Sequence, residues 1–228
     1  MTERFKRITA LLGDEAITKL KNATVMVVGC GAVGSFAIEA LARSGVGHIV
    51  VVDFDVVEES NINRQIFALS STIGMPKVDV AASRIRDINP DADVVAINTF
   101  FDDKTNIDVH PDFVIDAIDT IDSKIALYKW CVAHNISFAA SMGAALKTDP
   151  TQIRVGCILK TSVCPLASRV RKIVRDEKLP DFPVVYSTEC PNRTAAKPGR
   201  VFGSVAMITS SFGLRLADVA IKNIINLH

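Results

Sequence analysis

The first feature of the sequence that could do chemistry is a glycine-rich turn. Gly29, Gly31 and Gly34 form the pattern GxGxxG directly after an apolar run. Such glycines let the backbone approach a phosphate at the positive end of the following helix. Asp53 ends a second apolar run, where a carboxylate can accept hydrogen bonds from a ribose. These residues predict a nucleotide site, but an NAD-dependent dehydrogenase would share them.

Two cations that follow Asp53 favour a triphosphate over a dinucleotide. Arg64 and Lys77 carry more positive charge than a pyrophosphate cradled by backbone N–H groups requires. Arginine offers a fork of donors to phosphate oxygens, and lysine offers a point charge. Both can stabilise the charge that develops as pyrophosphate leaves. The pattern therefore favours ATP over NAD. The alternative is that both side chains are ordinary surface cations.

The same residues belong to a longer pattern with a fixed order along the chain. It consists of Gly29-x-Gly31-x-x-Gly34, Asp53-Phe54-Asp55, Ser60-Asn61-x-x-Arg64-Gln65, Pro76-Lys77 and Asp116-x-x-Asp119. This pattern resembles the adenylation domain of the ubiquitin-activating, E1-like (ThiF/MoeB) superfamily over roughly residues 3 to 145. Several ordered motifs are far more specific than one GxGxxG turn.

The resemblance implies an enzyme that adenylates a carboxylate with ATP and Mg²⁺. The implied nucleotide contacts are Gly29, Gly31, Gly34, Asp53, Asp55, Asn61, Arg64, Lys77 and Asp119. Asp53 would hold the ribose, and Asn61, Arg64 and Lys77 would hold the phosphates. Asp119 would ligate Mg²⁺, although its place before a predicted helix also suits an N-cap. The resemblance leaves room for a monovalent cation.

The basic N-terminus indicates that a second subunit contributes to the nucleotide site. Arg4-Phe5-Lys6-Arg7 resembles the segment from which E1-like enzymes send an arginine to the ATP of the neighbouring subunit, and Arg7 is the matching residue. The resemblance therefore implies a homodimer with shared sites, in which Arg7 joins Arg64, Lys77 and Asp119 as a catalytic residue. The other interpretation is a solvated basic N-terminus.

The second half of the chain indicates a branch of the superfamily. The relevant segments are Ser141-Met142-Gly143-Ala144, Asp149-Pro150-Thr151-Gln152-Ile153, Lys160-Thr161, Pro165-Leu166, Arg169-x-Arg171 and Tyr186-Ser187-Thr188-Glu189. They resemble the tRNA threonylcarbamoyladenosine dehydratases, so the resemblance covers nearly the whole chain. It implies ATP-dependent cyclisation of N6-threonylcarbamoyladenosine in tRNA through an acyl-adenylate, with release of AMP and pyrophosphate. It also leaves room for a sulfur-relay protein as a partner.

Two other functions stay open at this point. The first is an adenylyltransferase that activates the C-terminus of a ubiquitin-like sulfur carrier. Such enzymes commonly carry two CxxC pairs for zinc, and the sequence has none, which counts against this function and predicts no zinc. The second is a non-catalytic scaffold, which would have no need of Arg64, Lys77 and Asp119 together.

Positive charge is concentrated in the second half. Residues 160 to 200 hold nine Lys or Arg against four Asp or Glu, whereas the net charge of the chain is only +1. Such a stretch suits contacts with tRNA phosphates, or it is a solvated helix face. The candidate tRNA-binding residues on the predicted helix are Arg169, Arg171, Lys172 and Arg175.

The cysteines bear on both compartment and chemistry. Five widely spaced cysteines are typical of a reducing compartment. No apolar run reaches the roughly 18 residues of a transmembrane helix, so we expect a cytoplasmic protein without a membrane segment. Cys164 and Cys190 each precede a proline, in or beside predicted loops. Cys190 is the better candidate for a thiol that accepts the activated acyl group, although intramolecular ring closure needs none.

The elements that must position these residues alternate along the first half. Apolar runs predict strands at 24–29, 48–53, 93–98, 113–116 and 136–140, and helical spacing predicts helices at 33–43, 77–88 and 123–134. This order predicts an α/β fold with a doubly wound, mostly parallel Rossmann-like sheet. Such sheets bind ligands beyond the carboxyl ends of their strands.

The second half is less regular. Strands are predicted at 152–160 and 182–187, a basic helix at 165–178 and a loop at 190–200. A long helix follows at 203–227, with Gly213 as a candidate break. We expect residues 1–228 to form a single E1-like adenylation domain. Its nucleotide-binding core would span about residues 20–145, and a part facing the substrate and tRNA would span about residues 146–228.

Overall fold

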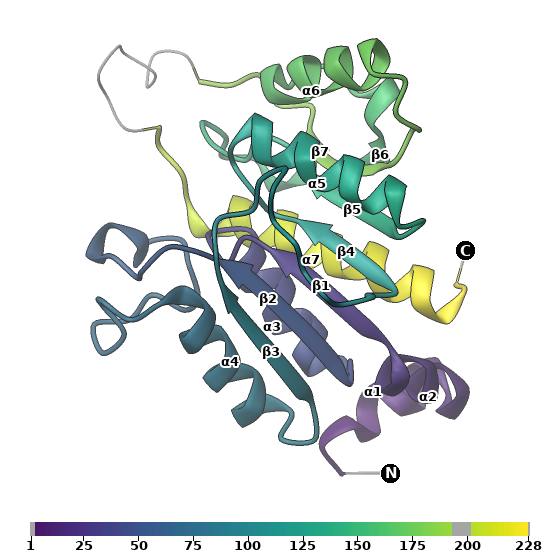
Figure 1. Ribbon diagram of the computed structural model, residues 1–228. Coiled ribbons are helices and arrows are strands. Elements are labelled where there is room, and N and C mark those ends of the chain that lie inside the picture. Colours follow the sequence, from purple (N-terminus) through teal and green to yellow (C-terminus); the bar gives the residue numbers. More distant parts are fainter. Residues whose placement is uncertain (1–2, 193–201, 228) are drawn as a thin grey trace.

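The computed structural model describes residues 3–192 and 202–227, and one sheet runs through their centre (Figure 1). Its strands stand in the order β3-β2-β1-β4-β5-β7-β6. They are β1 (Thr24–Val28), β2 (His48–Asp53), β3 (Asp93–Asn98), β4 (Phe113–Asp116), β5 (Ser137–Ser141), β6 (Ile153–Cys157) and β7 (Pro183–Ser187). All neighbours run parallel except β6 and β7. The mostly parallel sheet predicted from the sequence is confirmed.

Helices cover both faces of this sheet (Figure 1). The helices of the described residues are α1 (Lys6–Leu12), α2 (Asp14–Asn22), α3 (Gly34–Arg43), α4 (Lys77–Ile88), α5 (Ile121–Ala133), α6 (Pro165–Asp176) and α7 (Ala206–Ile225). Side chains of α3, α4 and α7 share one hydrophobic core with the sheet, and those of α5 and α6 share a second core. The apolar runs of the inner strands are buried between these cores, as expected for a doubly wound fold.

The long C-terminal helix α7 is continuous, so the break expected at Gly213 is wrong. α7 packs against α3, and a Cβ at Gly213 would overlap the carbonyl oxygen of Val33 and lie 2.9 Å from the nitrogen of Ala37. The glycine therefore serves the close approach of two helices and not a helix break. No described helix combines the length and the apolar character needed to cross a bilayer.

Two further expectations need correction. The strand expected at 152–160 ends at Cys157, because residues 158–160 form a short 3₁₀ helix (Ile158–Lys160). The helices α1 and α2 were not predicted, although they occupy most of the first 22 residues. Of the predicted loop at 190–200, residues 193–200 lie outside the part of the chain that the structure describes.

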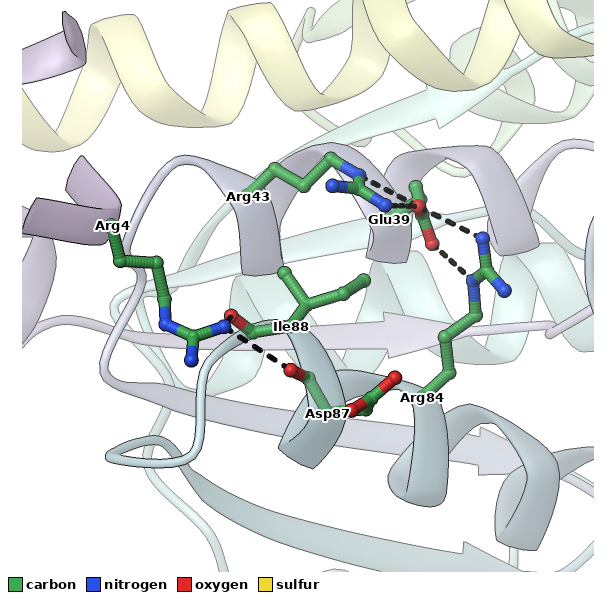
Figure 2. A network of polar contacts seen from close by, with 6 residues as sticks. All are labelled: Arg4, Glu39, Arg43, Arg84, Asp87 and Ile88. Atoms are coloured by element: carbon green, nitrogen blue, oxygen red, sulfur yellow. Dashed lines mark hydrogen bonds and ion pairs between the residues drawn. The ribbon is translucent and has the colours of Figure 1, made fainter.

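A network of arginines ties the N-terminal segment and two helices together, as Figure 2 shows. Nη1 of Arg4 donates to the carbonyl oxygen of Ile88, at 2.7 Å, at the end of α4. Glu39 on α3 accepts hydrogen bonds from Nε of Arg43, at 2.7 Å, and from Nε of Arg84, at 2.5 Å. Burial alone would raise the pKa of the Glu39 carboxyl, but the hydrogen bonds from Arg84 and Arg43 outweigh it and lower the pKa. The network therefore holds α3 against α4.

Candidate active site

A cavity of about 920 Å³ opens beyond the carboxyl ends of the parallel strands, at the size typical of ligand pockets. Its wall contains most of the residues that the sequence analysis selected for a nucleotide: Gly29, Gly31, Asp53, Asp55, Asn61, Arg64, Lys77 and Asp119. They come from the loops that follow β1, β2 and β4 and from the start of α4. Tertiary structure thus gathers residues that are spread over some ninety positions of the sequence.

Part of the glycine turn lines this cavity. Gly29 adopts a φ of +98°, and a Cβ there would lie 2.7 Å from the carbonyl oxygen of Ala117, which follows β4. Gly34 does not line the cavity, and a Cβ on it would overlap the Gly29 carbonyl oxygen. Gly29 and Gly34 are therefore required by the packing of the turn. A Cβ on Gly31 would meet only Nε2 of Gln65, at 3.9 Å, so Gly31 is the glycine of the turn that packing does not require and that leaves room for a ligand.

Asp53 braces the turn from the end of β2. Its Oδ2 accepts a hydrogen bond from the backbone N–H of Cys30, at 2.5 Å, and its Oδ1 accepts one from the N–H of Asp55, at 2.8 Å. An ionised carboxylate offers about four acceptor sites. The two that these contacts leave suit the hydroxyl groups of a ribose.

The two predicted cations have different surroundings. Lys77 is nearly buried, and its Nζ lies 2.8 Å from Oδ2 of Asp55. Arg64 donates from Nη1 to the carbonyl oxygen of Ser60, at 2.7 Å, and to Oδ1 of Asn63, at 2.9 Å. Both of these acceptors are neutral, and Arg64 forms no ion pair with a carboxylate of the described residues. Its positive charge is therefore available to an anion in the cavity.

Hydrogen bonds hold the segment that carries Arg64, some within the segment and others to Ser204 before α7 and to Thr209 on α7. Asn61 is buried, and its Oδ1 accepts the backbone N–H of Glu58 at 3.3 Å. Asn63 donates to the carbonyl oxygen of Ser204, at 3.0 Å, and Thr209 on α7 donates to that of Arg64, at 3.3 Å. Residues near the C-terminus therefore position a cation from the first half of the chain.

Asp119 lies on the exposed loop between β4 and α5. The N-cap of α5 is Thr120, so the N-cap role considered for Asp119 is wrong. The Asp119 carboxylate has no hydrogen bond or ion pair with any described residue and borders the cavity. The described residues contain no cluster of three metal-ligating side chains. Mg²⁺ commonly needs only one or two carboxylates when substrate phosphates and water supply its other ligands, and Asp119 fits that role.

Other selected residues lie away from this wall. Arg7 is exposed on α1 and does not line the cavity. α1 precedes the amino end of β1, so it lies at the opposite end of the sheet (Figure 1). On α6, Arg171 donates to both the carbonyl oxygen and Oγ1 of Thr161, each at 2.6 Å, whereas Arg169, Lys172 and Arg175 are exposed.

The structure also separates the two candidate thiols. Cys190 is exposed and does not line the cavity. Cys164 is buried at the N-cap of α6 and does line it. Of the two, Cys164 is therefore nearer to the proposed chemistry, and Cys190 does not face the cavity of its own chain.

A buried polar group next to the cavity wall could not be predicted from the motifs. Lys124 and Tyr128 on α5 both donate to Oδ2 of Asp116, at 2.7 and 2.6 Å. A lysine and a tyrosine four residues apart share one face of a helix, and that face points into the core here. The signal in the sequence was a lysine inside the apolar stretch 123–132, next to a strand that ends in aspartate.

Comparison with known proteins agrees with this geometry. The ThiF family profile matches residues 5–227. A tRNA threonylcarbamoyladenosine dehydratase of Bacillus subtilis is 48% identical over 195 residues, covering 84% of this chain and 77% of the relative. The enzyme of that name from Escherichia coli is 36% identical over 252 residues, covering 96% and 92%.

A solved structure of a relative is also similar to this chain. The crystal structure of E. coli tRNA N6-threonylcarbamoyladenosine dehydratase in complex with ATP has a TM-score of 0.91 at 36% identity, and the match covers 98% of this chain and 94% of that one. The family profile spans nearly the whole chain, and the curated relatives are similar along most of their length, so this protein belongs to the ThiF family.

Proposed function

We propose that this protein uses ATP to dehydrate N6-threonylcarbamoyladenosine in tRNA, as the names of its relatives state for them. The observation that carries the proposal is the cavity wall on which Asp53, Arg64, Lys77 and Asp119 converge. ATP is the nucleotide of the related crystal structure. The resemblance to dehydratases along nearly the whole chain favours this reaction over activation of a sulfur carrier.

The chemistry requires two bond exchanges. The threonine carboxylate of the modified nucleoside attacks the α-phosphorus of ATP, which releases pyrophosphate and forms an acyl-adenylate. The neighbouring carbamoyl oxygen or nitrogen then attacks the activated carbonyl carbon, a carbamoyl N–H gives up its proton, and AMP leaves. The nucleoside has lost one water in total. Because the second attack is intramolecular, proximity accelerates it and no enzyme nucleophile is needed.

Residues of the cavity supply positive charge and orient ATP for the formation of the acyl-adenylate. Arg64 places its uncompensated guanidinium on the phosphates, and Lys77 exchanges its ion pair with Asp55 for a phosphate oxygen. Such groups act where charge develops in the transition state. Asp53 orients the ribose through the acceptor sites that Cys30 and Asp55 leave. Asp119 is the candidate carboxylate for Mg²⁺, which would neutralise phosphate charge.

Several parts of the proposal extend beyond one nucleotide site. Arg7 would act on the ATP of a second copy in a homodimer, because it does not reach the cavity of its own chain. On α6, tRNA phosphates would contact the exposed Arg169, Lys172 and Arg175. The guanidinium of Arg171 is instead hydrogen-bonded to Thr161. We further propose that the protein works in the cytoplasm, and the resemblance to the dehydratases leaves room for a sulfur-relay protein as a partner.

We also propose that residues 1–228 act as one adenylation domain. The nucleotide-binding part, about residues 20–145, and the part facing the substrate, about residues 146–228, contribute to one sheet, because β7 pairs with β5. Helix α7 packs against α3, β4 and β5. A shared sheet and core support a single folding unit.

One experiment tests the reaction. The protein is incubated with ATP, Mg²⁺ and tRNA that carries N6-threonylcarbamoyladenosine, and the digested nucleosides are weighed by mass spectrometry. We expect the nucleoside to lose the mass of one water, with one AMP formed for each. A protein that forms AMP only with a sulfur-carrier protein, and leaves the tRNA unchanged, would be the adenylyltransferase instead.

A further inference from the structure

A fully buried ion pair lies directly behind the cavity. The side chains of Lys124 and Asp116 have no exposed surface, and Nζ of Lys124 lies 2.7 Å from Oδ2 of Asp116. The hydroxyl of Tyr128 donates to the same oxygen. Burial, together with the charge of Asp116, raises the pKa of that hydroxyl, which therefore stays protonated and keeps its role as a donor.

The pair joins the ends of two neighbouring strands. Asp116 is the last residue of β4, and its Oδ1 accepts the backbone N–H of Ile118, at 3.0 Å. Nζ of Lys124 also donates to the carbonyl oxygen of Ser141, the last residue of β5, at 2.8 Å. One ammonium group therefore connects the turn that leads to Asp119 with the start of the loop after β5.

Both connected segments form part of the cavity wall. Ile118 and Asp119 line it after β4, and Met142 and Gly143 line it after β5. β4 and β5 are paired by backbone hydrogen bonds only up to Asp116 and Ala140. Beyond that point each segment bonds to its other neighbour, Ala117 to Val28 and Met142 to Val185, and Lys124 contacts both strand ends through Asp116 and Ser141.

A contribution to the free energy of folding does not explain why this ion pair is buried. Burying two charges carries a large desolvation penalty, and a well-packed apolar replacement is often as stable or more so. The surrounding core is apolar, with Ile125, Leu127 and Phe138 among its members. A buried charge pair that fastens two ligand-facing turns fits a role in geometry better than a role in folding energy.

We propose that Lys124 is a positioning residue for the nucleotide site. By holding Asp116 and the Ser141 carbonyl together, it sets the distance between the β4 and β5 turns and the direction in which Asp119 faces the cavity. This inference rests on the proposed function, because it assumes that ATP and Mg²⁺ occupy the cavity. Lys124 does not line the cavity itself and acts through Asp116 and Ser141.

Three variants separate positioning from stability. Lys124→Met removes the ammonium but leaves Asp116 buried without its cation. The double variant Asp116→Asn with Lys124→Met removes both charges, and the asparagine can still accept the Ile118 N–H. Lys129→Met is the matched control on the same helix, because its ion pair with Glu177 is largely exposed. Each variant is tested by thermal unfolding, by calorimetry with ATP in the presence and absence of Mg²⁺, and by the rate of AMP formation.

We expect Lys124→Met to lose much of its thermal stability and the double variant to recover most of it. The double variant should nevertheless need about tenfold more Mg²⁺ for tight ATP binding, the usual scale for removing an outer partner of a metal ligand. Its rate of AMP formation should fall about 10²-fold, as misplacement by about 1 Å can cause. Lys129→Met should match the wild type throughout.

The inference is overturned if the double variant folds, binds ATP with Mg²⁺ and forms AMP within twofold of the wild type. If both Lys124 variants fail to fold, Tyr128→Phe tests the inference instead. It removes one hydrogen bond from Asp116, and we expect a smaller loss in the same measurements, whereas no change would count against the network. A wild-type protein that binds ATP but leaves the tRNA unchanged would refute the proposed function alone, since calorimetry still reports on Lys124.

Discussion

Removing the side chain of Arg64 should affect the proposed reaction far more than the stability of the fold. In the structure its guanidinium donates to two neutral oxygens, on Ser60 and Asn63, and pairs with no carboxylate of the described residues. Arg64→Ala therefore breaks two hydrogen bonds that a half-buried guanidinium donates to neutral oxygens. A hydrogen bond contributes about 0.5 to 1.5 kcal/mol, so the loss of two should lower the free energy of unfolding by about 1 to 3 kcal/mol.

The effect on the reaction should be much larger. Removing one group that stabilises developing charge commonly reduces the rate by about 10²- to 10³-fold, equivalent to about 2.7 to 4 kcal/mol. The assay is the rate of AMP release with ATP and the modified tRNA, measured beside thermal unfolding. The expected result is a folded protein that forms AMP at least about 10²-fold more slowly than the wild type.

Arg84→Ala is the matched control, because Arg84 is also an arginine but does not line the cavity, and its guanidinium pairs with Glu39 instead (Figure 2). It donates to the buried carboxylate of Glu39, and hydrogen bonds to charged groups contribute about 1.5 to 3 kcal/mol. This variant should lose stability and keep its rate below its unfolding temperature. If Arg64→Ala forms AMP within twofold of the wild type, Arg64 is not part of the reaction and the reasoning from its uncompensated charge fails.

Four further outcomes are expected. Gly213→Ala should lower the free energy of unfolding by about 1 to 3 kcal/mol, because the new Cβ overlaps α3, and chemical denaturation checks this against Ala206→Gly at the start of α7. The pKa of Glu39 is lowered in the fold, so the stabilisation by its carboxylate is complete above its ordinary pKa of 4.5 and is lost as the pH falls through the lowered pKa. Glu39→Gln should therefore flatten the acid side of the curve of unfolding free energy against pH. Parallel curves for the variant and the wild type would contradict this. Mixing Arg7→Ala with Arg64→Ala chains should restore part of the activity if Arg7 acts across a dimer, and no recovery after proven subunit exchange would place it elsewhere. Reversing Arg169, Lys172 and Arg175 to Glu should weaken tRNA binding and reduce its salt slope by about one for each phosphate that is no longer neutralised, whereas Lys21→Glu on α2 should change neither.

Much of the nucleotide site could be predicted because its signals are local. A GxGxxG turn between an apolar run and a helix is typical of a nucleotide site in a parallel sheet, and an aspartate at the end of the next run faces the same edge. The strands at 48–53, 93–98 and 113–116 and the helix at 77–88 have the predicted boundaries. Continuous apolar runs can be recognised in a sequence because inner strands of such a sheet are buried on both faces.

The sequence alone could not decide which polar residues are available to a ligand. Arg171 and Arg175 look equivalent in the chain, but the fold places Thr161 within reach of Arg171 only. Cys164 and Cys190 both precede prolines, yet only Cys164 lines the cavity. These differences arise from contacts between segments that are distant in sequence, and no local pattern records them.

The strands of the nucleotide-binding half, the glycine turn and the cations that favour a triphosphate can be recognised in the amino-acid sequence. These features depend on side-chain type and spacing within single elements. Three other features depend on the fold: Gly213 serves helix packing, α7 holds the segment of Arg64, and Lys124 is buried against Asp116 and Ser141. A buried charge is tolerated only where the fold brings its partners to it, and those partners come from β4 and β5, which meet in space because parallel strands pair across long connections.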